Sequence, residues 1–149
     1  MFAPKNILVP TDFSEFSDNA LEKAYDIAKQ YKAKIHLLHV IGVVQTCAVD
    51  YCFDQATIDD LDRKAAESSK EIMRKQIEKV VRSKDVEIAA YVTKGTPYEE
   101  ILKEQQSKNI DLIVIASHGR TGILGHLIGS VAEKVVRAAT CPVVLVKNR

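Results

Sequence analysis

The sequence predicts a single α/β domain in which a mainly parallel, five-stranded sheet lies between two layers of helices. Short aliphatic runs alternate along the whole chain with stretches of helical periodicity, and no Pro/Gly/Ser-rich linker divides them. Strands that are covered by helices on both faces have such near-continuous aliphatic sequences. The length of 149 residues, 28% of them charged and 46% hydrophobic, suits one globular domain over residues 1–149.

The first strand is expected at residues 7–9, where Pro10 ends an aliphatic run. Apolar residues at helical spacing then continue to Tyr31 and predict the first helix. The second strand is expected at residues 35–41, which are mostly aliphatic, and Gly42 ends it. The chain therefore opens with a strand, a helix and a second strand.

Residues 43–56 show no clear periodicity and are interpreted as a loop. Thr57, with Asp60 three residues later, resembles a capping box and predicts the start of a long helix that reaches Val80. In residues 86–92, every second side chain is aliphatic, and the positions between them are Glu87, Ala89 and Tyr91. This period of two predicts a strand with one better-buried face, toward an edge of the sheet.

The last two strand and helix pairs carry clear boundary signals. Thr96-Pro97 supplies an N-cap and a proline at the first helical position of the third helix. The run Leu112–Ala116 gives the strongest buried-strand signal in the chain. Ser130 and Glu133 predict a capping box for the fourth helix, and Val143–Val146 is expected to be the last strand.

The composition excludes several classes of protein. With 21 Lys plus Arg against 20 Asp plus Glu, the net charge of +1 gives no electrostatic reason to expect binding to nucleic acid or to an anionic membrane. The aliphatic runs fall far below the roughly 18 residues that a membrane span needs, and the apolar run before Pro10 is too short for a signal peptide. Cys47, Cys52 and Cys141 are interpreted as thiols in a reducing compartment. We therefore expect a cytoplasmic protein.

In such folds, ligands bind beyond the carboxyl ends of the strands, where the winding direction of the sheet reverses. The strand ends to examine are Pro10, Val40 and Ala116. Residues 116–130 follow the last of these and contain four glycines: Gly119, Gly122, Gly125 and Gly129. Glycine lets backbone N–H groups approach an anion closely, and a following helix N-terminus adds free donors and a positive dipole end. The segment is therefore a candidate phosphate site.

The alternative is that these glycines only turn a loop and that Ser130 only caps its helix. Two common nucleotide motifs are absent from the sequence. No Gly-Lys-Ser/Thr follows a four-residue spacer, as it does in a P-loop, and the dinucleotide pattern G-x-G-x-x-G does not follow the first strand. The glycine spacing alone therefore leaves both interpretations open.

Several collinear motifs resemble the universal stress protein family. Its signature G-2x-G-9x-G-[S/T] reads here as Ala116-Ser-His-Gly119, nine residues and Gly129-Ser130, with alanine in place of the first glycine. Further matches to the family occur in the same order at residues 7–14, 38–40, 95–97, 100–101, 111–114, 118–120 and 141–146. Residues 43–56 lie outside this agreement.

The resemblance implies a Rossmann-like, adenine nucleotide alpha hydrolase-like fold that holds ATP between the ends of the first and fourth strands. It implies nucleotide-binding roles for Pro10, Thr11, Asp12, Val40, Ile115, Ala116, His118, Gly119, Gly129, Ser130 and Val131. Asp12 and the backbone of Val40 would meet the adenine, and the segment from Gly129 would meet the phosphates. Any Mg²⁺ would be held mainly by phosphate oxygens. Family members are often dimeric, which implies a homodimer through Val143–Val146.

Three functions remain open on the sequence. The first is a cytoplasmic stress protein that binds ATP as a regulatory ligand. The second is a slow ATPase or nucleotidyl transferase in which His118 and Ser130 act chemically, although no residue is an evident catalytic base. The third is a nucleotide-free, homodimeric interaction module in which the Ala116 methyl group closes the site.

Other side chains are weaker candidates. His36 and His39 lie in a predicted strand and are interpreted as packed rather than catalytic. Cys47 and Cys52 invite a metal or redox interpretation, but their spacing is not C-x-x-C and four zinc ligands in defined pairs are lacking. Arg120 could pair with phosphate, but a lone loop arginine is more often solvated.

Overall fold

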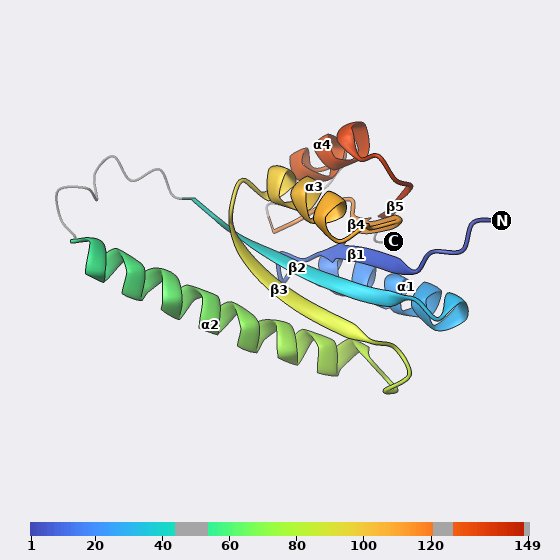
Figure 1. Cartoon of the computed structure of the whole chain (residues 1–149), viewed down its shortest axis with the longest axis horizontal. Helices are drawn as coiled ribbons and strands as arrows, with labels where there is room; N and C mark the ends of the chain where they lie inside the picture. The colour runs from blue at the N-terminus through green and yellow to red at the C-terminus, as the bar shows by residue number, and fades with distance from the viewer. Residues whose placement is uncertain (44–53, 121–126, 148–149) are drawn as a thin grey trace.

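The computed structural model describes residues 1–43, 54–120 and 127–147. Strands and helices alternate along them (Figure 1): β1 (Asn6–Pro10), α1 (Glu15–Tyr31), β2 (Lys34–Gly42), α2 (Gln55–Val80), β3 (Ile88–Gly95), α3 (Pro97–Ser107), β4 (Leu112–Ala116), α4 (Ser130–Ala138) and β5 (Val143–Val146). The strands form one sheet in the order β3-β2-β1-β4-β5, and each neighbouring pair is parallel. The predicted five-stranded α/β fold is confirmed, and β3 lies at an edge as expected.

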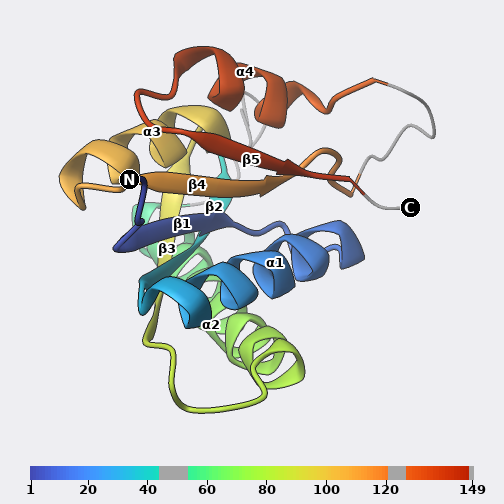
Figure 2. The same ribbon diagram turned by 90° about the vertical axis from the view of Figure 1, so that its right-hand side faces the viewer.

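Helices cover both faces of the sheet and give the predicted three layers. α1 and α2 lie on one face, and α3 and α4 lie on the other (Figure 2). Because side chains alternate along a strand, each strand contributes to two cores. Ile7 and Val9 of β1 face the α1/α2 side, whereas Leu8 between them faces the α3/α4 side. All three are fully buried.

The winding direction of the sheet reverses between β1 and β4. The chain passes from β1 outward through β2 to β3, and then returns past β1 to place β4 on its other side. The carboxyl ends of β1 and β4 are therefore neighbours, but the segments that follow them go to helices on opposite faces. This arrangement predicts an opening at these two strand ends.

The start of α2 corrects the sequence prediction. The helix begins at Gln55 because the Asp54 side chain caps it, with an oxygen that accepts from the Thr57 amide at 2.8 Å. Thr57 and Asp60 therefore do not form the expected capping box. Gln55 and Ala56 belong to the helix rather than to a loop, and residues 44–53 lie outside the described part of the chain.

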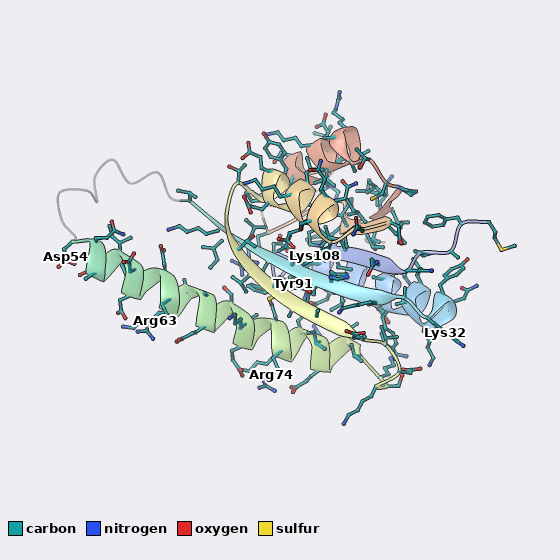
Figure 3. The ribbon with its side chains drawn as sticks, in the orientation of Figure 1. Lys32, Asp54, Arg63, Arg74, Tyr91 and Lys108 are labelled. Carbon is teal, nitrogen blue, oxygen red and sulfur yellow. The ribbon has the colours of Figure 1, made fainter. Side chains whose placement is uncertain are left out.

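α2 has a narrow buried face and a wide charged surface. Over its 26 residues, only Ser69, Met73 and Gln76 are buried. Arg63 and Arg74 project on the side away from β3 (Figure 3) and pair with carboxylates on their own helix. None of the helices in the described residues is both long enough and apolar enough to span a membrane.

Candidate functional site

A cavity of about 290 Å³ opens at the carboxyl ends of β1, β2 and β4, beside the start of α4. The cavity is lined by every residue to which the family resemblance assigned a binding role: Pro10, Thr11, Asp12, Val40, Ile115, Ala116, His118, Gly119, Gly129, Ser130 and Val131. The lining also includes residues without a predicted role: Ser17, Leu38, His39, Pro97, Ile101, Ser117, Arg120 and Ala132. Two segments that are more than 100 positions apart in the sequence thus meet at the predicted strand ends.

Asp12 connects the loop after β1 to the loop after β4. Its Oδ1 accepts from the amide of Ser14 at 3.0 Å and from the Ser14 hydroxyl at 2.5 Å, and its Oδ2 accepts from the Arg120 amide at 2.8 Å. Burial acts to raise the pKa of Asp12, but these hydrogen bonds outweigh it and hold the pKa below the usual value of 3.8. Asp12 is therefore an ionised hydrogen-bond acceptor at neutral pH.

The lowered pKa of Asp12 gives a pH-dependent contribution to stability. This contribution is fully present above the unfolded-state pKa, and it is lost as the pH falls through the lower folded-state pKa, because protonation breaks the bonds to Ser14 and Arg120. We expect Asp12→Asn to reduce the free energy of unfolding at neutral pH and to match the wild type more closely at low pH. Urea unfolding of both proteins from pH 7 to pH 3 checks this, and a constant difference across that range would contradict it.

The loop after β1 makes a tight turn at Phe13, which has a positive φ of 68°. Two contacts hold this left-handed residue. Its amide donates to Thr11 Oγ1 at 3.1 Å, and its ring stacks on His39, with 4.1 Å between the ring centroids. The conformation is uncommon outside glycine and asparagine, so the surrounding contacts must maintain it. This turn places Asp12 at the mouth of the cavity.

His39 has a defined tautomer. Its Nδ1 lies 2.8 Å from the carbonyl oxygen of Thr11, which can only accept, so Nδ1 carries the proton. Burial lowers the pKa of His39, although this hydrogen bond opposes the shift. The ring is therefore mainly neutral at pH 7 and presents Nε2 as an acceptor.

Val40 presents backbone groups on the side of β2 that β1 leaves uncovered. Just past the end of β1, the Thr11 amide donates a backbone hydrogen bond to the Leu38 carbonyl of β2 at 2.8 Å. The pairing of β1 with β2 ends at Pro10 and Leu38 and does not reach Val40. Because backbone groups alternate in direction along a strand, the N–H and C=O of Val40 point to the same side as the Leu38 carbonyl. They can therefore hydrogen-bond to a ligand in the cavity.

The start of α4 supplies backbone donors to the cavity lining. Gly129, and not Ser130, is the N-cap, and Ser130 is the first helical residue, with no side-chain capping bond. The predicted capping box of Ser130 with Glu133 is therefore wrong. The first helical bond runs from the Glu133 amide to the Gly129 carbonyl, so the amides of Ser130, Val131 and Ala132 precede the helical ladder. These amides and the Ser130 hydroxyl suit an anion.

A backbone hydrogen bond connects the two ends of the glycine-rich segment, residues 116–130. The Gly129 amide donates to the Ser117 carbonyl at 2.7 Å, which brings the start of α4 against the end of β4. A Cβ atom on Gly129 would lie 3.2 Å from that carbonyl oxygen. The absence of a side chain thus permits the close approach. Gly122 and Gly125 lie outside the described residues.

Ala116 ends β4 in a strand conformation and has no positive φ. It is 9% exposed and packs in the core on the α1/α2 face while it also lines the cavity. The cavity is thus open with alanine at this position.

His118 makes a different contact from the one that the enzyme hypothesis requires. Its Nδ1 lies 2.9 Å from Ser117 Oγ, and its Nε2 is buried with no hydrogen-bond partner among the described residues. A buried nitrogen cannot take a proton from a ligand in the cavity unless the ring moves. His118 and Ser130 line the same cavity, but no hydrogen bond joins them in the described structure.

Comparisons with known proteins agree with this architecture. A model of the universal stress protein family matches residues 4–147. The universal stress protein MJ0531 of Methanocaldococcus jannaschii is 34% identical over 144 residues, which cover 97% of this chain and 82% of the relative. The chain belongs to the universal stress protein family.

Solved structures support the same conclusion. The structure of MJ0577, a universal stress protein of Methanocaldococcus jannaschii, has a TM-score of 0.83 and 30% identity and covers 99% of both chains. The universal stress protein UspA of Lactobacillus plantarum has a TM-score of 0.79 and 28% identity, with 95% of this chain and 97% of that chain covered. The family and the fold implied by the sequence motifs are therefore confirmed.

In this universal stress protein, His39 lies in β2 and packs on Phe13, in agreement with the prediction that it is packed in a strand. It also lines the cavity, a role that the sequence did not predict, because β2 extends past the end of β1. Among the described residues, no group of three or more His, Cys, Asp or Glu side chains could hold a metal, and Cys47 and Cys52 lie outside this part of the chain.

Proposed function

We propose that this universal stress protein binds ATP as a regulatory ligand in the cavity between the ends of β1 and β4, in a cytoplasmic stress response. The observation that supports the proposal most is the convergence of the residues from the family signature on one cavity. The cavity is lined by backbone donors at the start of α4, by the Asp12 carboxylate and by Val40. Such a cavity can recognise an anion and a polar ring at the same time.

In this proposal the phosphates lie against the start of α4. The amides of Ser130 and Val131, the Ser130 hydroxyl and the dipole of α4 would bind them. Asp12 and the backbone of Val40 would meet the adenine. The ribose and phosphates would be lined by Ile115, Ala116, His118 and Gly119. Among the described lining residues Asp12 is the only acidic one, and this proposal places it at the adenine, away from the phosphates. A Mg²⁺ ion would therefore be held mainly by phosphate oxygens.

Equilibrium dialysis of the nucleotide-stripped protein against ATP, and separately against GTP, tests this proposal. We expect retention of ATP and weaker retention of GTP, because GTP offers the same phosphates with a different base edge to Asp12 and Val40. Equal retention of both nucleotides would contradict the adenine contacts. Retention of neither would contradict the proposal as a whole.

A regulatory role is favoured over turnover by the placement of His118. Its Nδ1 faces Ser117 and its Nε2 is buried, so neither nitrogen is placed as a base toward the cavity. We expect phosphate release at saturating ATP to be slow and unaffected by His118→Ala, because His118 lines the cavity without acting as a base. Release that depends on His118 would instead support the enzyme hypothesis.

We also propose a homodimer through β5. This strand ends the sheet and pairs only with β4 in the described residues, and Val144 is 38% exposed on it. A second copy can continue the sheet by pairing along this free edge about a two-fold axis.

Val144→Asp is expected to shift the protein from dimer to monomer, because it places a charge at the centre of the proposed interface. Sedimentation velocity at micromolar concentrations measures the change. Val136→Asp is the control, since Val136 is similarly exposed, at 45%, but lies on α4. A wild-type monomer at high micromolar concentration would contradict the proposal.

A further inference from the structure

A buried amide of α2 contacts the loop that carries Asp12. Gln76 is only 6% exposed and does not line the cavity. Its Oε1 lies 3.0 Å from Thr11 Oγ1, and its Nε2 lies 2.7 Å from Asp18 Oδ1 and 3.4 Å from Ser17 Oγ. Thr11 and Ser17 are both cavity-lining residues. α2 contributes no residue to the described lining, but its Gln76 is hydrogen-bonded to two side chains that do line the cavity.

The hydrogen-bond directions in this cluster are determined by Asp18. The Asp18 carboxylate accepts from Lys79 through Oδ2 and from the Gln76 NH₂ group through Oδ1, so the carbonyl oxygen of Gln76 faces Thr11. Thr11 Oγ1 lies 3.0 Å from both Gln76 Oε1 and Ser17 Oγ, so its single proton has two possible acceptors. The Gln76 NH₂ group already lies 3.4 Å from Ser17 Oγ, whereas no other donor faces Gln76 Oε1 among the described residues, so we assign the Thr11 proton to Gln76. The Ser17 hydroxyl donates in turn to the Ser14 carbonyl at 2.8 Å.

With its proton directed at Gln76, the Thr11 hydroxyl offers a lone pair to the backbone. It accepts from the Phe13 amide at 3.1 Å, across the turn that has Asp12 at its centre. The Thr11 carbonyl accepts from His39. Thr11 therefore contacts both the left-handed turn at Phe13 and the ring of His39. Its own side chain is held by Gln76 from α2 and by Ser17 from α1.

We infer that Gln76 is a positioning residue of the nucleotide site, which acts through Thr11 to hold the turn that presents Asp12. The inference rests on the proposed function, because it assigns Asp12 to ligand binding. It also links the position of α2 to the occupancy of the cavity. A displacement of α2 that withdraws Gln76 lowers nucleotide affinity, and bound nucleotide stabilises α2 in its present position to the same extent.

The test compares Gln76→Met, Thr11→Val and the double variant by calorimetric titration with ATP. Methionine has nearly the length of glutamine but cannot accept from Thr11, and valine keeps the branched shape of threonine without its hydroxyl. We expect each single variant to bind ATP about tenfold more weakly, as for other residues that act indirectly on a site. The double variant is expected to lose no more than about a further twofold, because both changes break the same bond.

Lys79→Met is the matched control. Lys79 also extends from α2 to Asp18, with its Nζ 2.8 Å from Oδ2, but it makes no hydrogen bond to Thr11 in the described structure. We expect it to bind ATP like the wild type. Equal loss in Lys79→Met and Gln76→Met would show a general effect of α2 packing and would overturn the assignment.

Amide hydrogen exchange in the nucleotide-free protein gives a second measurement that does not depend on ATP. We expect the Phe13 amide to exchange faster in Gln76→Met and Thr11→Val, while amides of the central strand β4 keep their protection. If the wild type does not bind ATP, the proposed function fails, and Phe13 exchange still decides whether Gln76 holds the turn. If Gln76→Met does not fold, Gln76→Leu removes the same acceptor and is tested in the same way. Thr11→Val cannot replace it, because that variant removes the bond to the Phe13 amide directly. Wild-type affinity and wild-type Phe13 exchange in the folded variants would overturn the inference.

Discussion

Gly119→Val is expected to weaken ATP binding by roughly a hundredfold, which corresponds to about 3 kcal/mol. A Cβ atom at this position would lie 2.5 Å from Asp12 Oδ2, far inside contact distance. Asp12 would have to move and would lose its bond from the Arg120 amide. Overpacking and the loss of a charge-assisted hydrogen bond each cost on the order of 1 to 3 kcal/mol, and both effects fall on the residue proposed to meet the adenine.

Gly42→Val is the control for Gly119→Val. Gly42 is the last residue of β2, so it also lies at the carboxyl ends of the strands. A Cβ atom there would meet nothing within 4 Å. Calorimetric titration with ATP is expected to give wild-type affinity for Gly42→Val, and circular dichroism checks that both variants fold. Equal affinities in the two variants would show that Asp12 does not need its present position for binding.

Ile113→Ala is expected to lower the free energy of unfolding by about 3 to 4 kcal/mol. Ile113 is fully buried on β4, and its neighbours in the sheet are Leu8 of β1 and Val143 of β5. Its side chain packs in the core on the α3/α4 face. Removing three carbon atoms there leaves a cavity that parallel strands and two covering helices cannot easily fill.

The same chemical change at Ile72 provides the comparison. Ile72 lies on α2 and is 40% exposed, so Ile72→Ala is expected to cost less than about 1 kcal/mol. Urea unfolding measures both changes in the free energy of unfolding, with one value for the dependence on urea concentration fitted to all three proteins. A similar cost at the two positions would contradict the burial assigned to β4.

The sequence predicted most accurately those elements that combine a buried aliphatic run with clear boundary residues. β4 and β5 have the predicted bounds, because an aliphatic run between polar residues has few alternative ends. The ends of helices were harder to predict. Asp54 caps α2 from a segment that shows no periodicity, and Gly129 takes the N-cap position that was expected for Ser130. A one-residue shift of this kind depends on backbone angles that tertiary contacts determine.

Within the candidate site, motif spacing predicted which strand ends meet but not the contacts between their side chains. Asp12 was expected to face a ligand, and it does line the cavity, but it also accepts from the Arg120 amide of the facing loop. His39 and Gln76 could not be found from a local pattern. His39 reaches the cavity only because β1 is shorter than β2, and Gln76 reaches Thr11 from a position 65 residues away.

The proposed function requires that an adenine nucleotide occupies the cavity between β1 and β4. Calorimetric titration of the nucleotide-stripped wild-type protein with ATP and Mg²⁺ tests this most directly, with Gly119→Val titrated in parallel. We expect saturable binding of about one ATP per chain in the wild type, weakened by roughly a hundredfold in the variant. Absence of binding to the wild type at millimolar ATP, or equally tight binding to both proteins, would contradict it.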